Sequence, residues 1–218
     1  MQNNIIKQRN EKLAQKVITA LQKRHFDAYF CSNKDEVIQK LNELISKEDT
    51  ISSGGSTTLS ELGIPDYLTN NGYKFLSREN GKTIEEKAEI ARKAMTCDVF
   101  LMSSNAISED GQLVNIDGLG NRVAALIYGP KNVIIIAGMN KISKTLEDAY
   151  NRARNTAAPI NLQRIAALFG NTETPCLHTG SCADCKSESS ICAQIVTTRL
   201  CRPKGRIKVI LVNEELGY

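Results

Sequence analysis

The sequence contains no tryptophan, only 5% aromatic residues and only two histidines among its 218 residues. Proteins that bind single-stranded nucleic acid stack bases on aromatic side chains, and a net charge of +4 is small for a phosphate-binding surface. We therefore expect no nucleic-acid partner. Two histidines, His25 and His178, also offer no basis for a Ser-His-Asp or Cys-His catalytic set.

A long apolar run is absent as well. No segment approaches the roughly 18 apolar residues that span a bilayer, and the first residues, MQNNIIKQRNEKLAQK, lack the apolar core of a signal peptide. We expect no membrane partner and a cytoplasmic location. Thiols stay reduced in that compartment, and a chain of this length buries a core without cross-links. The seven cysteines are therefore not expected to form a disulfide framework.

Short apolar segments alternate with amphipathic ones along the chain. Strands are predicted in the segment that begins DTISS and at 26–31, 73–77, 97–104, 132–138 and 206–212. Helices are predicted at 3–24, 34–45, 83–95 and 122–128, and a further helix that starts near Thr145 is expected to break at Pro159. The alternation predicts an α/β sandwich of the three-layer type with a mostly parallel sheet. We expect one domain over 1–218, with a cysteine-rich insertion at 171–205 before the last strand.

The segment ISSGGSTTL contains a glycine-rich turn after a predicted strand. Successive backbone N–H groups at the start of a helix favour an anion such as a phosphate, a carboxylate or an acyl-carrier tail. An ordinary tight turn with a helix cap needs the same residue types, so both interpretations stay open. No Gly-Lys-Ser/Thr follows, which excludes a P-loop. The candidate anion-binding residues are Ser53, Gly54, Gly55, Ser56 and Thr57.

A second polar segment, SEDGQLVNIDGLGNR, follows the predicted buried strand 97–104. Its acidic residues could provide a general acid or base, and Arg122 could grip a carboxylate with its planar guanidinium. The alternative is a surface hairpin built on Asp-Gly turns. Loops at strand ends of α/β folds line the ligand crevice, so both interpretations are kept. The candidates in and beside this segment are Asn105, Glu109, Asp117, Asn121 and Arg122.

The segment PCLHTGSCADCKSESSIC holds Cys176, Cys182, Cys185 and Cys192 in the spacing C-x5-C-x2-C-x6-C. One short chelating pair with two outlying cysteines suits a [4Fe–4S] cluster, whose irons occupy the corners of a cube. Structural zinc, held by four thiolates or by three thiolates and His178, is the alternative, although it usually shows two short pairs. Cys201 is either a substitute ligand or a free thiol.

Three strings together resemble one family: SSGGSTTLSELGI, NAISEDGQLVNIDGLGNRVAALIYGPKNVIIIAGMNKI and CLHTGSCADCKSESSIC. They are similar to the lactate-utilisation (LUD) domain family of the LutC/YkgG type, and the resemblance extends from about residue 5 to 218. It implies a single α/β domain similar to the ribose-phosphate isomerase and CoA-transferase folds. In those relatives the glycine-rich turn, here Gly54 to Thr57, holds a phosphate or acyl group. The resemblance implies that Asn105, Glu109, Asp117, Asn121 and Arg122 line the same crevice.

The family takes its name from members that act with iron–sulfur partner proteins to oxidise L-lactate to pyruvate. LutC members of those systems lack the four-cysteine segment, so the resemblance suggests a subgroup that carries its own cluster. Our hypothesis is a cytoplasmic protein of small-carboxylate metabolism whose [4Fe–4S] cluster passes electrons or activates a substrate. The expected partners are a small carboxylate or phosphorylated ligand, iron–sulfur proteins and a second copy of the chain. The alternatives are a zinc-stabilised binding or regulatory domain, and an isomerase or hydrolase that uses the turn at 54–57.

Overall fold

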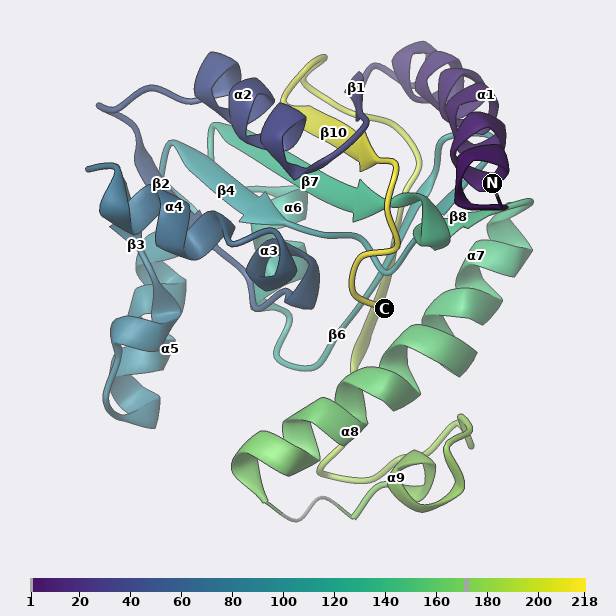
Figure 1. The fold of residues 1–218 in the computed structure, drawn as a ribbon. Helices are drawn as coiled ribbons and strands as arrows, with labels where there is room; N and C mark the ends of the chain where they lie inside the picture. The colour runs from purple at the N-terminus through teal and green to yellow at the C-terminus, as the bar shows by residue number, and fades with distance from the viewer. Residues whose placement is uncertain (1, 171–172) are drawn as a thin grey trace.

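The computed structural model describes residues 2–170 and 173–218, and a six-stranded parallel sheet occupies the centre of this part of the chain (Figure 1). The strand order is β1-β10-β7-β4-β2-β3. These strands are β1 (Asp27–Cys31), β2 (Thr50–Ser53), β3 (Lys74–Leu76), β4 (Val99–Met102), β7 (Asn132–Gly138) and β10 (Ile207–Val212). The predicted α/β fold with a mostly parallel sheet is confirmed.

The central strands β4, β7 and β10 are mostly apolar and buried along nearly their whole length, because both faces of the sheet are covered. Successive side chains of a strand point to opposite faces, so each strand contributes to two cores. Val133 and Ile135 of β7 belong to one core, and Ile134 and Ile136 belong to the other. The two cores make the sheet the middle layer of a three-layer arrangement.

Helices cover both faces of this sheet. Helices α1 (Gln2–Lys23) and α6 (Asn121–Ile127) supply apolar residues to the first core. Helices α2 (Lys34–Leu44), α3 (Thr57–Glu61) and α4 (Ile64–Asn70) supply them to the second. The connection from β3 to β4 contains helix α5 (Ile84–Lys93) and the short turns η1 (Arg78–Asn80) and η2 (Ala94–Thr96). Within the residues described, no helix combines the length and apolar character needed to cross a membrane.

Side-chain caps define where several helices begin. The side chains of Asn33, Ser56 and Thr83 each accept a hydrogen bond from the backbone amide three residues later. Thr145 does the same at α7 (Leu146–Arg152), and Asp148 completes a capping box. Each such cap contributes about 1 kcal/mol to stability.

A second sheet contains four strands in the order β8-β5-β6-β9. They are β5 (Ala106–Ser108), β6 (Leu113–Asp117), β8 (Ile142–Ser143), which follows the turn η3 (Met139–Lys141), and β9 (Gln194–Thr198). Strand β9 lies inside the segment 171–205, whose residues 171 and 172 fall outside the described part of the chain. The prediction of a cysteine-rich insertion before the last strand therefore lacked one strand, β9. The local sequence pattern does not predict β9, because its antiparallel partner, β6, lies far earlier in the chain.

The helix that begins at Leu146 does not break at Pro159, contrary to the prediction. It continues through the π-helical segment η4 (Ala153–Ala157) into α8 (Ala158–Phe169). The amide of Ala158 bonds to the carbonyl of Ala153, five residues back, so the widened turn comes directly before the proline that cannot donate. Figure 1 shows this long helix leading away from the six-stranded sheet to α9 (Pro175–Thr179) and the cysteine segment.

Candidate functional site

A crevice opens at the carboxyl ends of β2, β4 and β7. Parallel strands bring these ends to one edge of the sheet, where ligands of open α/β folds bind. The crevice consists of an inner cavity of about 90 Å³ and an outer cavity of about 280 Å³. The two cavities share the lining residues Gly55, Ile116, Arg122, Asn161 and Arg164. We call the two cavities together the anion crevice.

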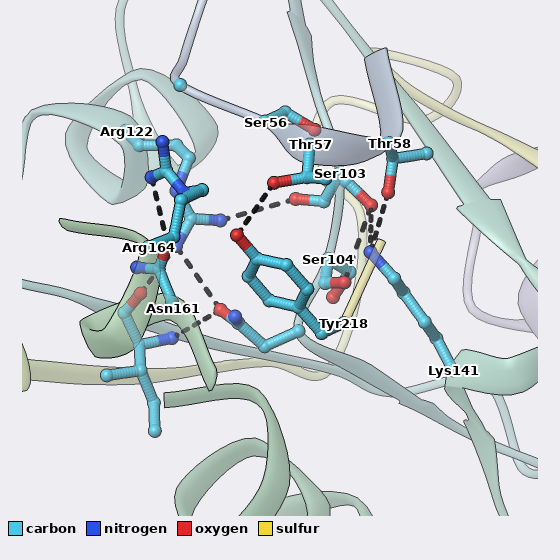
Figure 2. A pocket seen from close by; sticks show the side chains of 13 residues that line it. Ser56, Thr57, Thr58, Ser103, Ser104, Arg122, Lys141, Asn161, Arg164 and Tyr218 are labelled. Atoms are coloured by element: carbon cyan, nitrogen blue, oxygen red, sulfur yellow. Dashed lines mark hydrogen bonds between the residues drawn. The ribbon is translucent and has the colours of Figure 1, made fainter. Parts of the chain in front are cut away.

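Every charged side chain that lines the inner cavity is basic: Arg122, Lys141 and Arg164. Lys141 is only 3% exposed, and its Nζ donates hydrogen bonds to the hydroxyls of Thr58 (2.8 Å) and Ser103 (2.9 Å). Figure 2 shows the ring of Tyr218 between Lys141 on one side and Arg122 and Arg164 on the other. The positive lining favours an anionic ligand.

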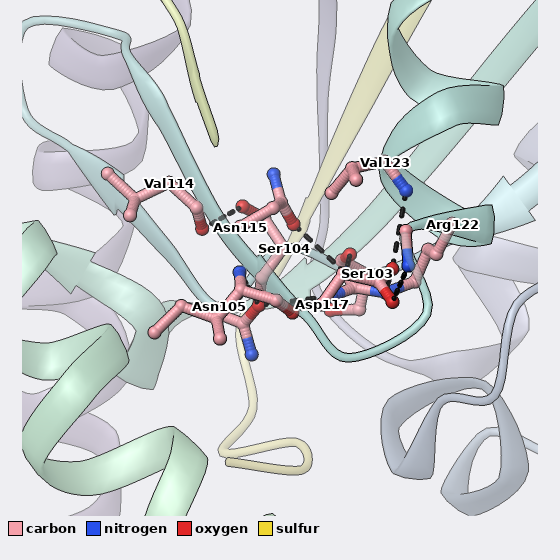
Figure 3. A network of polar contacts seen from close by, with 10 residues as sticks. Ser103, Ser104, Asn105, Val114, Asn115, Asp117, Arg122 and Val123 are labelled. Carbon is pink, nitrogen blue, oxygen red and sulfur yellow. Dashed lines mark hydrogen bonds and ion pairs between the residues drawn. The ribbon is translucent and has the colours of Figure 1, made fainter. Parts of the chain in front are cut away.

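Arg122 lies at the centre of a polar network (Figure 3). Its Nη1 donates to the carbonyl of Ser103 (3.2 Å) and to Asn115 Oδ1 (3.0 Å), and its Nη2 donates to Asn105 Oδ1 (3.2 Å) and to the Ile116 carbonyl. Its Nε lies 3.5 Å from Asp117 Oδ2, so all three guanidinium nitrogens have partners within the protein. Burial lowers the pKa of Arg122 and the carboxylate of Asp117 opposes that shift. Arg122 therefore supplies charge to the crevice while its donors hold the crevice wall.

The predicted glycine-rich turn lies at the edge of this crevice, but its residues differ in role. Gly55, Ser56 and Thr57 line the inner cavity, whereas Ser53 and Gly54 do not. A Cβ on Gly54 would come within 2.9 Å of Arg122 Cδ, so this glycine makes room for the arginine. The Ser56 hydroxyl caps α3 by accepting from the Leu59 amide (3.3 Å). The turn therefore is a capped tight turn. Three of its residues, Gly55, Ser56 and Thr57, also line the crevice.

The structure also brings together four residues predicted from the second polar segment. Asn105 and Arg122 line the inner cavity, and Asp117, Asn121 and Arg122 line the outer one. Asp117 accepts hydrogen bonds from the amides of Gly120 (3.0 Å) and Val123 (3.3 Å), so it fixes the loop before α6.

Glu109 lies elsewhere, and its predicted place in the crevice is wrong. It forms ion pairs with Lys16 and with Lys144, the second at 3.0 Å, in a groove beside α1. Strand β5 carries Glu109 away from the crevice to a hairpin turn, where Gly111 packs against the backbone of α1. The hydrogen bond from Lys16 is the largest influence that lowers the pKa of Glu109.

The crevice residues that the sequence did not predict include Arg78, Lys141, Asn161, Arg164 and Tyr218. The position of Lys141 in the sequence could have predicted it, because it follows the buried strand β7. The loops after such strands meet at the edge of the sheet that binds ligands. Arg78 is also notable because its buried Nε has no hydrogen-bond partner in the described residues. Asn161 and Arg164 come from α8, and no local pattern places that helix against the sheet edge.

All four cysteines of the segment 176–192 line one further cavity, of about 60 Å³, which we call the cysteine cavity. Cys176, Cys182, Cys185 and Cys192 are all free thiols. Nη2 of Arg154, in the π-helical segment η4, donates to Cys182 Sγ (3.4 Å) and to Asp184 Oδ1 (2.7 Å). A positive group therefore touches the cavity that the thiols surround.

The thiols of the cysteine cavity influence one another. Burial and then the negative charge of the other three thiols raise the pKa of Cys192 to about 11. Burial is also the main reason why the pKa of Cys176 is raised. Among residues 2–170 and 173–218, no group of three or more His, Cys, Asp or Glu side chains is placed to hold a metal ion. The four thiols share the lining of one cavity.

The two other candidate ligands lie apart from the cysteine cavity. Cys201 is fully buried in the first core, where its thiol donates to the Pro203 carbonyl (3.1 Å) and accepts from the Ile207 amide (3.2 Å). His178, in α9, does not contribute to the lining of the cavity as described.

The cysteine cavity and the anion crevice share a wall. Cys192 lines the cysteine cavity, while its neighbour Ile191 lines the outer cavity of the crevice. Likewise Pro159 of α8 faces the cysteines, and Asn161 and Arg164 of the same helix face the crevice. Two adjacent backbone segments therefore separate the two sites.

Comparison with known proteins identifies similarities of both sequence and fold. The model of the LUD domain family matches residues 14–212. The crystal structure of a DUF162 family protein from Deinococcus radiodurans superposes with a TM-score of 0.52 at 10% sequence identity, covering 94% of this chain and 98% of that one. None of the curated proteins matches the chain.

Proposed function

The chain belongs to the LUD domain family, and we propose that it serves small-carboxylate metabolism of the lactate type, with Cys176, Cys182, Cys185 and Cys192 as the residues that would hold a [4Fe–4S] cluster beside a carboxylate site in the anion crevice. The observation that carries this proposal is the shared wall between the two sites. Ile191 and Cys192 are consecutive residues, yet one faces the crevice and the other faces the cysteines. A cluster held by the cysteines would therefore supply its redox chemistry next to the crevice.

The arrangement of the thiols supports a cluster over a single zinc ion. A Zn–S distance of about 2.3 Å in a tetrahedral site brings the sulfurs to about 3.8 Å from one another. The four cysteines line one common cavity, and only Cys182 and Cys185 form a short chelating pair, whereas structural zinc usually shows two such pairs. A cube with iron at its corners holds four thiolates farther apart. When bound, such a cluster supplies one-electron redox chemistry at a potential set by its surroundings.

The residues of the crevice suit a small carboxylate. The charged side chains that line the inner cavity of about 90 Å³ are all basic, and its polar lining includes the hydroxyls of Ser56, Thr57 and Ser103. Donors of this kind bind a carboxylate and an adjacent hydroxyl or oxo group. The outer cavity leaves room for a longer substrate tail.

Spectroscopy and elemental analysis test the cluster directly. Protein purified without oxygen should be brown and contain about four iron and four sulfide ions per chain. Cys185→Ser should lose the visible absorption, because it removes one of the four thiols of the cavity. Cys201→Ala, which removes a core thiol outside that cavity, should keep it. Colourless protein with one zinc ion per chain would contradict the redox proposal and support the zinc-stabilised binding domain.

Arg154 provides a second test, through the reduction potential. Its guanidinium contacts Cys182 and favours additional negative charge at the thiolates. Arg154→Gln should therefore shift the midpoint potential to more negative values in an EPR-monitored redox titration. Lys186→Gln removes the same charge from a side chain that is 82% exposed, where solvent screens it, and should shift the potential less. Equal shifts in the two variants would mean that the contact with Cys182 has no specific effect.

A further inference from the structure

Lys141 is a buried amine without an acidic partner. Only 3% of the residue is exposed, and no carboxylate of the described residues forms an ion pair with it. Its Nζ contacts two neutral hydroxyls, on Thr58 and Ser103, at the wall of the inner cavity (Figure 2). A buried charge normally requires a charge of opposite sign beside it. Within the described part of the chain, Lys141 therefore has no carboxylate paired with it.

The charged groups around Lys141 are mostly positive. Arg152 at the end of α7 and Arg122 on α6 both disfavour a further positive charge, and only Glu61 on α3 favours it at a distance. Arg164 on α8 lines the same cavity. Burial is the largest influence and, with the two arginines, lowers the pKa of Lys141 to about 7. A substantial fraction of the amine is consequently neutral in the ligand-free protein at neutral pH.

The two hydroxyl partners allow this amine to change its protonation state. The hydroxyls of Thr58 and Ser103 donate to the carbonyls of Leu216 (3.3 Å) and Ser104 (3.5 Å), so both accept from Lys141. A neutral amine still has two N–H donors, so these two hydrogen bonds can persist in both protonation states. An ammonium group has three N–H donors, and these hydroxyls occupy two of them. Protonation leaves one donor for a ligand.

We propose that a small carboxylate binds in the inner cavity beside Lys141 and that the amine takes up one proton from solvent as the carboxylate enters. The proposal rests on the carboxylate class assigned under the proposed function and adds the anchoring residue and a coupling to pH. The new positive charge on Nζ balances the negative charge of the carboxylate, so a neutral pair forms inside the crevice. No covalent bond is made or broken.

The neighbouring arginines explain why Lys141 is the group that responds. The guanidinium nitrogens of Arg122 all have protein partners, and an arginine stays protonated in a protein. Arg164 uses Nε and Nη2 to hold Asn161 Oδ1, at 3.1 and 2.9 Å, which leaves Nη1 for a ligand. A compound with one carboxylate and a neighbouring hydroxyl or oxo group matches this combination of one ammonium, one guanidinium edge and several hydroxyls.

Titration calorimetry with L-lactate and with pyruvate tests the inference. At about pH 7.5, repeating the experiment in buffers of different ionisation enthalpy gives the number of protons taken up on binding, because these carboxylates do not titrate there. We expect an uptake of more than half a proton per site. Above about pH 8, affinity should fall about tenfold per pH unit, since each ligand then requires one proton.

Three variants separate the coupling from a structural effect. Lys141→Met should lose most of the binding, whereas Lys141→Arg keeps a permanent charge and should bind without proton uptake and independently of pH. Lys144→Met is the matched control, because Lys144 is 70% exposed and pairs with Glu109 outside the crevice. It should behave as the wild type. If Lys141→Met does not fold, the arginine variant and a [13C]lysine NMR titration of the wild-type protein, with a Lys141 midpoint near 7, provide the decisive measurements.

Several outcomes would overturn the inference. Carboxylate binding without proton uptake, or uptake that persists in Lys141→Arg, would show that another group responds. Binding of inorganic phosphate but of neither carboxylate would refute the ligand class. A failure of lactate and pyruvate to bind would refute the carboxylate site, while the iron and sulfide content would still decide the cluster separately.

Discussion

Replacing Lys141 with methionine should stabilise the ligand-free protein most near pH 6 and progressively less as the pH rises toward 10. The pKa of Lys141 is about 7 in the folded protein against 10.5 for an ordinary lysine. Between these values the unfolded chain binds more protons than the folded protein, so the wild type gains stability as pH rises. Below about pH 7 Lys141 is protonated in both the folded and the unfolded protein. The buried charge then lowers the free energy of unfolding of the wild type by its full amount.

The pH-dependent part of this difference should be on the order of 2–5 kcal/mol. The hydrogen bonds that methionine cannot make to Thr58 and Ser103 add an offset that does not vary with pH. Denaturant unfolding of both proteins across this pH range, under anaerobic conditions, measures the difference. Lys144→Met should show no such trend, because Lys144 is exposed. A constant difference between wild type and Lys141→Met would mean that Lys141 is not held in a charge-disfavouring site.

Replacing Arg122 with methionine should destabilise the protein by about 3 kcal/mol, because it removes one partner of a buried ion pair. The side chains of Arg122 and Asp117 are only 15% and 9% exposed. Without the guanidinium, Asp117 keeps the amides of Gly120 and Val123 but loses its counter-charge. The carbonyls of Ser103 and Ile116 lose their donor at the same time.

Denaturation midpoints of Arg122→Met and of Arg92→Met provide the comparison. Arg92 is 74% exposed and its pair with Glu89 lies on the surface of α5, so its loss should cost less than about 0.5 kcal/mol. In the double variant Asp117→Asn with Arg122→Met, part of the loss should be recovered, because no unpaired carboxylate remains. Similar costs for Arg122→Met and Arg92→Met would contradict the central role of Arg122 in the crevice wall.

Local patterns predicted the parts of the site that lie on continuous segments of chain. The apolar runs within 97–104 and 132–138 indicated the central strands, since strands covered on both faces are nearly continuous in apolar residues. The polar loops after such strands then indicated the edge at which Ser56, Thr57, Asn105 and Arg122 meet. Glu109 was misplaced because it belongs to the same polar segment, yet β5 turns it toward α1.

The α/β alternation, the family and the cysteine spacing follow from the order of residue types alone, because each depends on residues at short separations. Only the tertiary structure decided that α8 places Arg164 opposite Lys141, that Cys201 lies in the core, and that Ile191 and Cys192 separate two cavities. These relations depend on how elements far apart in the chain pack against one another. The low pKa of Lys141 also depends on tertiary packing, because it results from burial and from two arginines that approach from other helices.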